Sequence, residues 1–182
     1  VSLCLGSVEV SVSEMVDAYT TFVNKGIKVE PLYVTRIEDN KGNIISTFTP
    51  QYTEIISEET SHKMLEMLKA VINEGTGVRL RYRYQFKGDI GGKTGTTQNN
   101  SDGWFIGVTP ELVSGTWVGG EDRSIHFDNL REGQGASMAL PVWALYMQKV
   151  YADETLGYSD TLKFDIPEHL HKEYKECVSN DV

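Results

Sequence analysis

The stretch DIGGKTGTTQNNSDGWF, residues 89–105, sets a lysine and three threonines among closely spaced glycines. Within it, Lys93 is followed directly by Thr94, Gly95 and Thr96. Side chains alternate along a β-strand, so a strand here would place both threonine hydroxyls on one side, with a glycine between them. The residues therefore predict a ligand-binding strand or a phosphate-binding loop.

The letters GGKT match the end of the phosphate-binding pattern G-x-x-x-x-G-K-[ST]. That pattern needs glycine at position 87, which is Lys87 here, and Gly88 comes one residue too late. The pattern must also lead into a helix whose backbone N–H groups face the phosphates. The residues that follow, TGTTQNNSDG, have no helical period. A phosphate-binding loop is therefore excluded.

The charge balance of the 182-residue chain argues against a nucleic-acid partner. Asp and Glu number 26 against 17 Lys and Arg, which gives a formal net charge of −9 and a pI near 4.9. The basic cluster in residues 75–88 consists of Arg79, Arg81, Arg83 and Lys87. Such a cluster is typical of a solvated loop, and a ligand-binding role is the alternative.

Cysteines and histidines predict no disulfide framework and no metal site. Cys4 and Cys177 lie near opposite ends of the chain and are best interpreted as unrelated thiols. His169 and His171 lie in a polar tail without a matching set of acidic or thiol ligands. We expect no metal and no organic cofactor.

Apolar periodicity predicts three long helices. The first begins after Ser11, which has capping-box spacing to Glu14, and stops before Gly26. The second begins at Ser57, carries an apolar stripe (Met64, Leu65, Leu68, Val71, Ile72) and ends at Gly75. The third runs over about 137–151, with Pro141 in its first turn and a core side formed by Trp143, Tyr146, Met147 and Val150.

Extended segments fill much of the remaining sequence. A β-hairpin is predicted within 31–49, and three consecutive strands from 90 to 119 predict an antiparallel meander. Residues 75–88 and 120–135 are predicted to be loops. The fold class is therefore α+β, an antiparallel sheet flanked by helices. We place one domain over 1–152, with the hairpin as an insertion, and a polar tail over 153–182.

A Lys-Thr-Gly strand is typical of serine acyltransferases that act on D-alanyl peptides and β-lactams. Their substrates end in a carboxylate, which needs a fixed cation such as Lys93 and hydroxyl donors such as Thr94 and Thr96. Gly95 leaves room for the substrate backbone to pair along the strand. A backbone N–H of such a strand can also stabilise a tetrahedral oxyanion.

Further segments resemble class A penicillin-binding proteins. LCLGSVEVSVSEMVDAYTTFVNKG and the following RIEDNKG resemble the region after the S-x-N motif in that family. MLKAVINEGTG resembles the family's helix and G-T-G loop, GGKTGTTQNNSDGWFIGVTPELVSGTWVG its third-motif region, and GQGASMALPVWALYM its last helix. The resemblance runs to about residue 151.

The resemblance implies the C-terminal part of a transpeptidase domain in a bifunctional glycosyltransferase–transpeptidase. Lys93, Thr94, Gly95 and Thr96 would form the third catalytic motif, with both threonines holding the donor carboxylate. The Thr96 N–H would form half of the oxyanion hole, and Trp104 would pack on the neighbouring strand. The implied partners are stem peptides ending in D-Ala-D-Ala and, in a complete domain, β-lactam antibiotics.

The family's other two motifs are absent from this sequence. No serine is followed by lysine three residues on or by asparagine two residues on, so neither S-x-x-K nor S-x-N occurs. We expect that the chain is cut from a longer protein and cannot form an acyl-enzyme by itself. The parent would face the periplasm or cell exterior on an N-terminal membrane anchor.

The missing elements would also share the core, so we expect exposed apolar surface on the first two helices or at a sheet edge. Self-association could cover that surface. Two other functions remain open from the residues alone. One is a fragment of a β-lactamase or D,D-carboxypeptidase type of hydrolase, and the other is a non-catalytic peptidoglycan-binding module.

Overall fold

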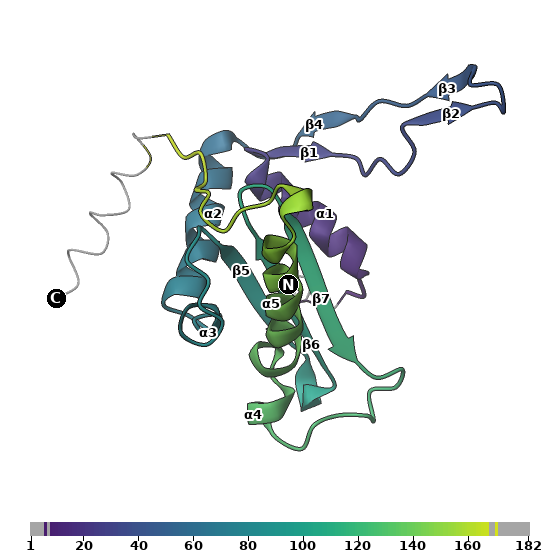
Figure 1. Ribbon diagram of the computed structural model, residues 1–182. Coiled ribbons are helices and arrows are strands. Elements are labelled where there is room, and N and C mark those ends of the chain that lie inside the picture. Colours follow the sequence, from purple (N-terminus) through teal and green to yellow (C-terminus); the bar gives the residue numbers. More distant parts are fainter. Residues whose placement is uncertain (1–5, 7, 168–169, 171–182) are drawn as a thin grey trace.

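The computed structural model describes residues 6, 8–167 and 170, which form a three-stranded sheet packed between helices (Figure 1). The strands are β5 (Gly91–Thr96), β6 (Asp102–Val108) and β7 (Val113–Gly119), in the spatial order β5-β6-β7. Both pairings are antiparallel. The predicted α+β class and the antiparallel meander are confirmed.

Helices cover both faces of this sheet. On one face, α5 (Gly135–Ala152) packs so closely that a Cβ added at Gly107 would lie 2.3 Å from the Trp143 ring. On the other face, α1 (Val12–Val23) meets β7, where a Cβ at Gly115 would lie 2.9 Å from Val16. The third long helix, α2 (Glu58–Asn73), runs beside β5. The sheet is therefore the middle layer of the molecule.

The core centres on the indole of Trp143, which is 1 % exposed. Its ring meets Phe105 of β6 edge-to-face, with centroids 5.2 Å apart, and lies 5.9 Å from the Phe86 ring. The indole Nε1–H donates to Ser114 Oγ at 2.7 Å. A buried Trp is stabilised best when its N–H has such a partner, because an unpaired polar group in a core costs free energy.

Helix starts follow the predicted capping signals. Ser11 Oγ accepts from the Glu14 N–H at 3.2 Å, and Glu14 Oε2 accepts from the Ser11 N–H at 2.8 Å. This reciprocal pair is the predicted capping box, and it lowers the pKa of Glu14, chiefly through the bond from the Ser11 backbone. At α2, Ser57 Oγ accepts from the Thr60 N–H at 3.2 Å.

The predicted hairpin is confirmed and forms an arm that extends away from the helices and main sheet (Figure 1). Its tip consists of β2 (Arg36–Glu38) and β3 (Ile44–Thr47), and its base of β1 (Ile27–Val29) and β4 (Tyr52–Glu54). The base pairing was not predicted. At the tip, Asp39 Oδ1 accepts from the N–H groups of Lys41 and Asn43. No residue between 30 and 60 is buried.

Two predicted loops each contain one helical turn. Within 75–88, α3 (Arg79–Tyr82) forms because Leu80 is fully buried and anchors the turn in the core. Within 120–135, α4 (Leu130–Gly133) is capped by Asn129, whose Oδ1 accepts from the Glu132 N–H. Helices of four residues carry no periodic signal, and this is why the loop predictions were wrong at these positions.

The last helix is longer than predicted, and two details of the prediction were wrong. Pro141 is the seventh residue of α5 and lies beyond its first turn. Tyr146, assigned to the core, is 50 % exposed. The buried residues of α5 centre on the line through Trp143 and Met147, and Tyr146 lies on the flank of that stripe at 100° per residue. Trp143, Met147 and Val150 are buried as predicted.

The segment after α5 folds back over the domain. It begins with the short η3 (Glu154–Leu156) and then passes residue 89, where the Asp89 N–H donates to Leu162 O and Asp89 Oδ2 accepts from the Phe164 N–H, both at 3.3 Å. Phe164 and Ile166 pack against the cluster of Leu65, Leu68 and Val108. Cys4, Cys177, His169 and His171 lie outside the described residues.

Exposed apolar surface is present, as expected, but its distribution differs from the prediction. On α1 the apolar side chains are half-buried, while Met67 of α2 is 55 % and Trp117 of β7 is 41 % exposed. Further exposed apolar side chains lie on the arm and on the outer face of α5. Among them are Tyr33, Ile44 and Ile45, and Val142 and Leu145. Self-association stays a prediction.

Candidate active site

The Lys-Thr-Gly residues lie on β5, the edge strand of the sheet. Among the described residues, β5 has a strand neighbour on one side only, which is β6. Gly91 and Gly92 at the start of the strand are buried, whereas Lys93 and Thr96 are exposed. The predicted strand over 90–97 is thus confirmed, and its half that carries Lys93 to Thr96 is the more exposed one.

Backbone groups of the two threonines face the open edge. The Thr97 N–H donates to Asp102 O at 3.1 Å, so residues 97 and 102 form a hydrogen-bonded pair. Hydrogen-bonded and non-hydrogen-bonded pairs alternate along an antiparallel ladder. With Thr94 opposite Phe105 and Thr96 opposite Gly103, the N–H and C=O groups of both threonines point away from β6. They can therefore pair with an added extended chain.

The side chains of Thr94 and Thr96 are held by contacts from two other segments. Thr94 Oγ1 lies 2.7 Å from Thr76 Oγ1, in the loop after α2. Thr96 Oγ1 accepts from the N–H of Gly135, the first residue of α5, at 2.9 Å. The Thr96 hydroxyl hydrogen stays available, and the Thr76–Thr94 pair retains one hydroxyl hydrogen to donate. Both can serve an anionic acceptor.

Lys93 projects from the other face of β5, because neighbouring side chains alternate. Its Nζ donates to its neighbour's carbonyl, Thr94 O, at 2.7 Å. Among the described residues no carboxylate forms an ion pair with this ammonium group, whereas four other lysines are paired. The charge of Lys93 is therefore free to meet an anion at the strand edge.

Close packing favours glycine at one position around the strand and requires it at another. A Cβ at Gly95 would lie 3.0 Å from the Cβ of Trp104, which is directly opposite on β6. Trp104 is half-buried and faces Trp117 of β7, in agreement with the predicted packing role. A Cβ at Gly135 would lie 2.1 Å from Gly95 O, so only glycine lets α5 begin this close to β5.

Thr76 and Gly135 were assigned no role from the sequence. Thr76 stands in the G-T-G loop, which was noted only for its resemblance to a family segment. Neither contact has a local signal, because 18 residues separate Thr76 from Thr94 and 39 separate Thr96 from Gly135. All four predicted residues, by contrast, occupy one strand and lie together.

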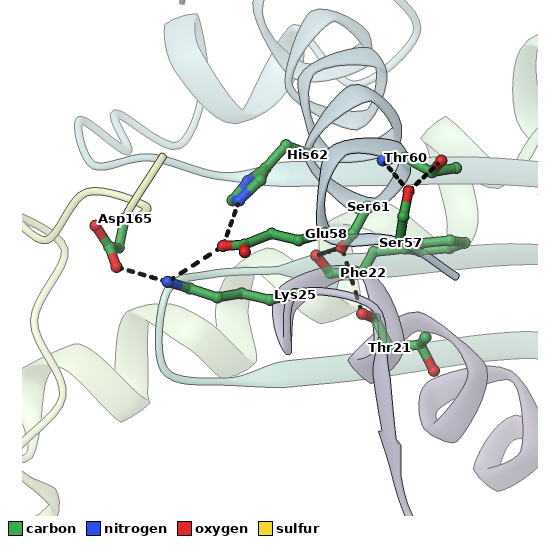
Figure 2. Close-up of polar contacts among 9 residues, drawn as sticks. All are labelled: Thr21, Phe22, Lys25, Ser57, Glu58, Thr60, Ser61, His62 and Asp165. Carbon is green, nitrogen blue, oxygen red and sulfur yellow. Dashed lines mark hydrogen bonds and ion pairs between the residues drawn. The ribbon is translucent and has the colours of Figure 1, made fainter. Parts of the chain in front are cut away.

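A second polar cluster joins α1, α2 and the C-terminal segment (Figure 2). Lys25 Nζ lies 2.9 Å from Asp165 and 3.5 Å from Glu58, and the buried His62 contacts Glu58 at 3.3 Å. The hydrogen bond from Lys25 lowers the pKa of Asp165, and the bond from His62 is the largest cause of the lowered pKa of Glu58. Ser61 Oγ also donates to Phe22 O at 2.8 Å. We interpret this cluster as structural, because its contacts hold the end of α1, the start of α2 and the C-terminal segment together.

Comparison with known protein families shows which family this chain belongs to. Residues 1–119 match the family described as penicillin binding protein transpeptidase domain. The chain belongs to this family. Its transpeptidase-domain match covers α1, the arm, α2 and all three strands of the main sheet.

Individual penicillin-binding proteins agree with this assignment. Penicillin-binding protein 1A of Aquifex aeolicus is 34 % identical over 149 residues, which cover 82 % of this chain and 20 % of the relative. The crystal structure of penicillin-binding protein 1A from Haemophilus influenzae matches with a TM-score of 0.76 and 25 % identity, over 92 % of this chain and 29 % of that one. The chain therefore spans about a fifth of the first relative's length.

A more distant structure shows the same fold. Penicillin-binding protein A from Mycobacterium tuberculosis, solved as its penicillin G acyl-enzyme complex, matches with a TM-score of 0.56 and 20 % identity. The match covers 79 % of this chain and 33 % of that structure. This chain thus carries part of a penicillin-binding transpeptidase fold.

Proposed function

We propose that this chain is the Lys-Thr-Gly part of a serine D,D-transpeptidase that cross-links peptidoglycan stem peptides. The observation that carries the proposal is the open edge of β5. There the backbone of Thr94 and Thr96, their held hydroxyls and the unpaired Lys93 ammonium meet. Membership of the transpeptidase family and the 20 % of the 1A relative that the chain covers support a larger parent. The resemblance to class A penicillin-binding proteins implies that this parent would also carry glycosyltransferase activity.

The donor stem peptide would bind as an added strand along β5. Its terminal D-Ala carboxylate would accept hydrogen bonds from the Thr94 and Thr96 hydroxyls, with Lys93 supplying the positive charge. Gly95 would allow close approach of the peptide backbone. The outward N–H of Thr96 would donate to the carbonyl oxygen of the scissile bond, where negative charge develops in the tetrahedral intermediate.

The covalent step requires a nucleophilic serine within an S-x-x-K motif, and this sequence contains no such motif. In such a reaction the serine oxygen forms an ester with the penultimate D-Ala carbonyl carbon, and terminal D-Ala leaves with a proton. An acceptor amine then forms the cross-linking amide and releases the serine. A β-lactam would form the same ester by ring opening. Because S-x-x-K and S-x-N are absent, the 182-residue chain should be inert in both reactions.

The reaction would take place on the periplasmic or extracellular side of the cytoplasmic membrane, where peptidoglycan lies. Within the described part of the chain, no helix has the length and apolar character needed for a membrane span.

Fluorescent-penicillin labelling tests the proposal. The 182-residue chain should not label, whereas a folded longer polypeptide that also carries S-x-x-K and S-x-N should. Lys93→Ala in that polypeptide should slow labelling by about 10²-fold or more, the range for loss of one stabilising donor. Thr76→Val should slow it by about tenfold, because Thr94 would lose its hydroxyl partner.

Lys87→Ala is the matched control, because Lys87 is an exposed lysine six residues before Lys93 and outside β5. Its labelling rate should equal that of the wild type. If the folded longer polypeptide fails to label, a non-catalytic peptidoglycan-binding role takes first place. If it labels and then rapidly releases hydrolysed penicillin, the protein is a hydrolase.

A further inference from the structure

A hollow of about 350 Å³ is lined by residues of α3, α4 and the first turns of α5. Its lining consists of Arg79, Tyr82, Arg83, Tyr84, Arg131, Ser137 and Pro141, which we call the arginine pocket. Three of these seven residues carry a full positive charge, and none is acidic. In a chain with a net charge of −9, this concentration of positive charge needs an explanation.

The first arginine is fixed in place by the fold. Arg79 Nη1 donates to Ala136 O at 3.1 Å and to Ser137 Oγ at 3.0 Å. Ser137 Oγ in turn donates to Arg131 O at 2.7 Å, which joins α4 to α5 at the floor of the pocket. A guanidinium has five N–H donors, so Arg79 retains donors for a ligand while its position is already set.

The other two arginines are exposed at the rim. Arg83 lies over the ring of Tyr84, with its guanidinium carbon 5.7 Å from the ring centroid, and Arg131 enters from α4. Among residues 8–167, no ion pair involves Arg79, Arg83 or Arg131. Like charges gathered in one hollow repel, and a bound anion removes that repulsion.

The structure also divides the basic cluster that the sequence suggested. Arg81 points elsewhere, because its Nη1 donates to Phe86 O at 3.0 Å and Gly88 O at 2.8 Å, and its Nε to Asn73 Oδ1. Arg81 is therefore structural, whereas Arg79 and Arg83 combine with Arg131 from a segment about fifty residues later. Their convergence favours the ligand-binding alternative over a solvated loop.

We propose that the arginine pocket binds a phosphate-bearing ligand. Guanidinium groups bind phosphate oxygens in two-bond forks, and three of them around one hollow can neutralise a doubly charged group. The volume is at the small end of the range for ligand sites, about 300–1,000 Å³, and suits one phosphate with a small substituent. The exposed ring of Tyr82 and the half-buried ring of Tyr84, which both line the pocket, can contact that substituent.

Two sources offer this chemistry, a soluble phosphate compound and a phospholipid headgroup. A phospholipid headgroup is supported by the apolar side chains beside the pocket. Val142, Leu145 and Tyr146 follow Pro141 on the outer face of α5, and each is at least 50 % exposed. An apolar surface beside a cationic pocket is suited to a membrane surface. The proposal is independent of the transpeptidase function, because the pocket involves none of the residues assigned to acyl transfer.

The test uses the 182-residue chain and an Arg83→Gln/Arg131→Gln variant. Both side chains are exposed and, within the described part of the chain, neither donates a hydrogen bond nor forms an ion pair, so the fold should persist, as far-UV circular dichroism would verify. The control is Arg36→Gln/Lys41→Gln, which removes the same charge from the arm. Tripolyphosphate binding is measured by calorimetry in 0.15 M salt, and flotation is measured with phosphatidylglycerol vesicles and phosphatidylcholine vesicles.

Loss of two charge-assisted contacts should weaken binding by about 10²-fold in the pocket variant and leave the control unchanged. Selective loss of tripolyphosphate binding would assign a soluble phosphate ligand. Selective loss of flotation with phosphatidylglycerol would assign a headgroup. The proposal is overturned if the wild type binds neither probe, or if the arm variant weakens binding as much as the pocket variant.

Discussion

Substituting Gly107 by alanine should disrupt the contact between β6 and α5, because the Trp143 indole lies directly against the Gly107 backbone. The new Cβ would lie 2.3 Å from both Cε2 and Cζ2 of the ring, about 1 Å inside ordinary contact. The ring cannot withdraw, since Phe86 and Phe105 pack against it and it is 1 % exposed.

The expected cost follows from two contributions. Forcing a methyl group into a packed core costs about 1–3 kcal/mol. Moving the indole also breaks the 2.7 Å bond from Nε1 to Ser114, which leaves a buried N–H unpaired at about 1–3 kcal/mol. Together these give roughly 2–6 kcal/mol, a large part of the about 5–15 kcal/mol that stabilises a typical domain.

Urea denaturation followed by circular dichroism measures this loss and tests its cause. Gly107→Ala should lower the midpoint by roughly 1–3 M at an m-value of about 2 kcal/mol/M. In a Trp143→Phe background, which lacks the indole nitrogen and fused ring, the same substitution should cost at least about 1 kcal/mol less. Equal costs in the two backgrounds, within about 0.5 kcal/mol, would refute the proposed clash.

Two further predictions concern the helix termini. Burial raises the pKa of Tyr151 to about 12, so its contribution to stability is fully present below pH 10, the pKa of an ordinary tyrosine, and is lost as the pH rises through 12. Unfolding midpoints at pH 9 and 11.5 should differ less in Tyr151→Phe than in the wild type, and an unchanged difference would contradict this. Ser11→Ala should lower the free energy of unfolding by about 1 kcal/mol through loss of the capping box. Ser13→Ala, a serine that caps no backbone N–H, is its control in the same urea titration, and equal losses would argue against the cap.

Local signals were enough to predict most of the architecture. The spacing of Ser11 and Glu14, the apolar stripe of α2 and the turn residues around Asp39 each act within a few residues of the element that they specify. The short helices α3 and α4 were missed because one turn has no period, and the burial of Leu80 that anchors α3 arises only in the folded core.

The sequence singles out the residues of the candidate site, but it does not predict the contacts that hold their side chains in place. Lys93 to Thr96 form a contiguous motif, so their chemistry can be inferred from their order alone. The Thr76–Thr94 and Gly135–Thr96 contacts depend on how α2 and α5 pack against β5, which no local pattern encodes. The assignment of Tyr146 to the core was wrong for a related reason. Helical spacing predicts where the apolar stripe of a helix runs but not how wide that stripe is.

The arm has a consequence for engineering. Since none of its side chains is buried, neither the core nor the β5 edge depends on its length or sequence. The Asp39–Asn43 turn is therefore a suitable place to insert a reporter domain or an affinity tag, where the added loop closure costs only about 0.6 kcal/mol per doubling of length. A fusion at this tip would report on the protein's location while leaving β5 untouched.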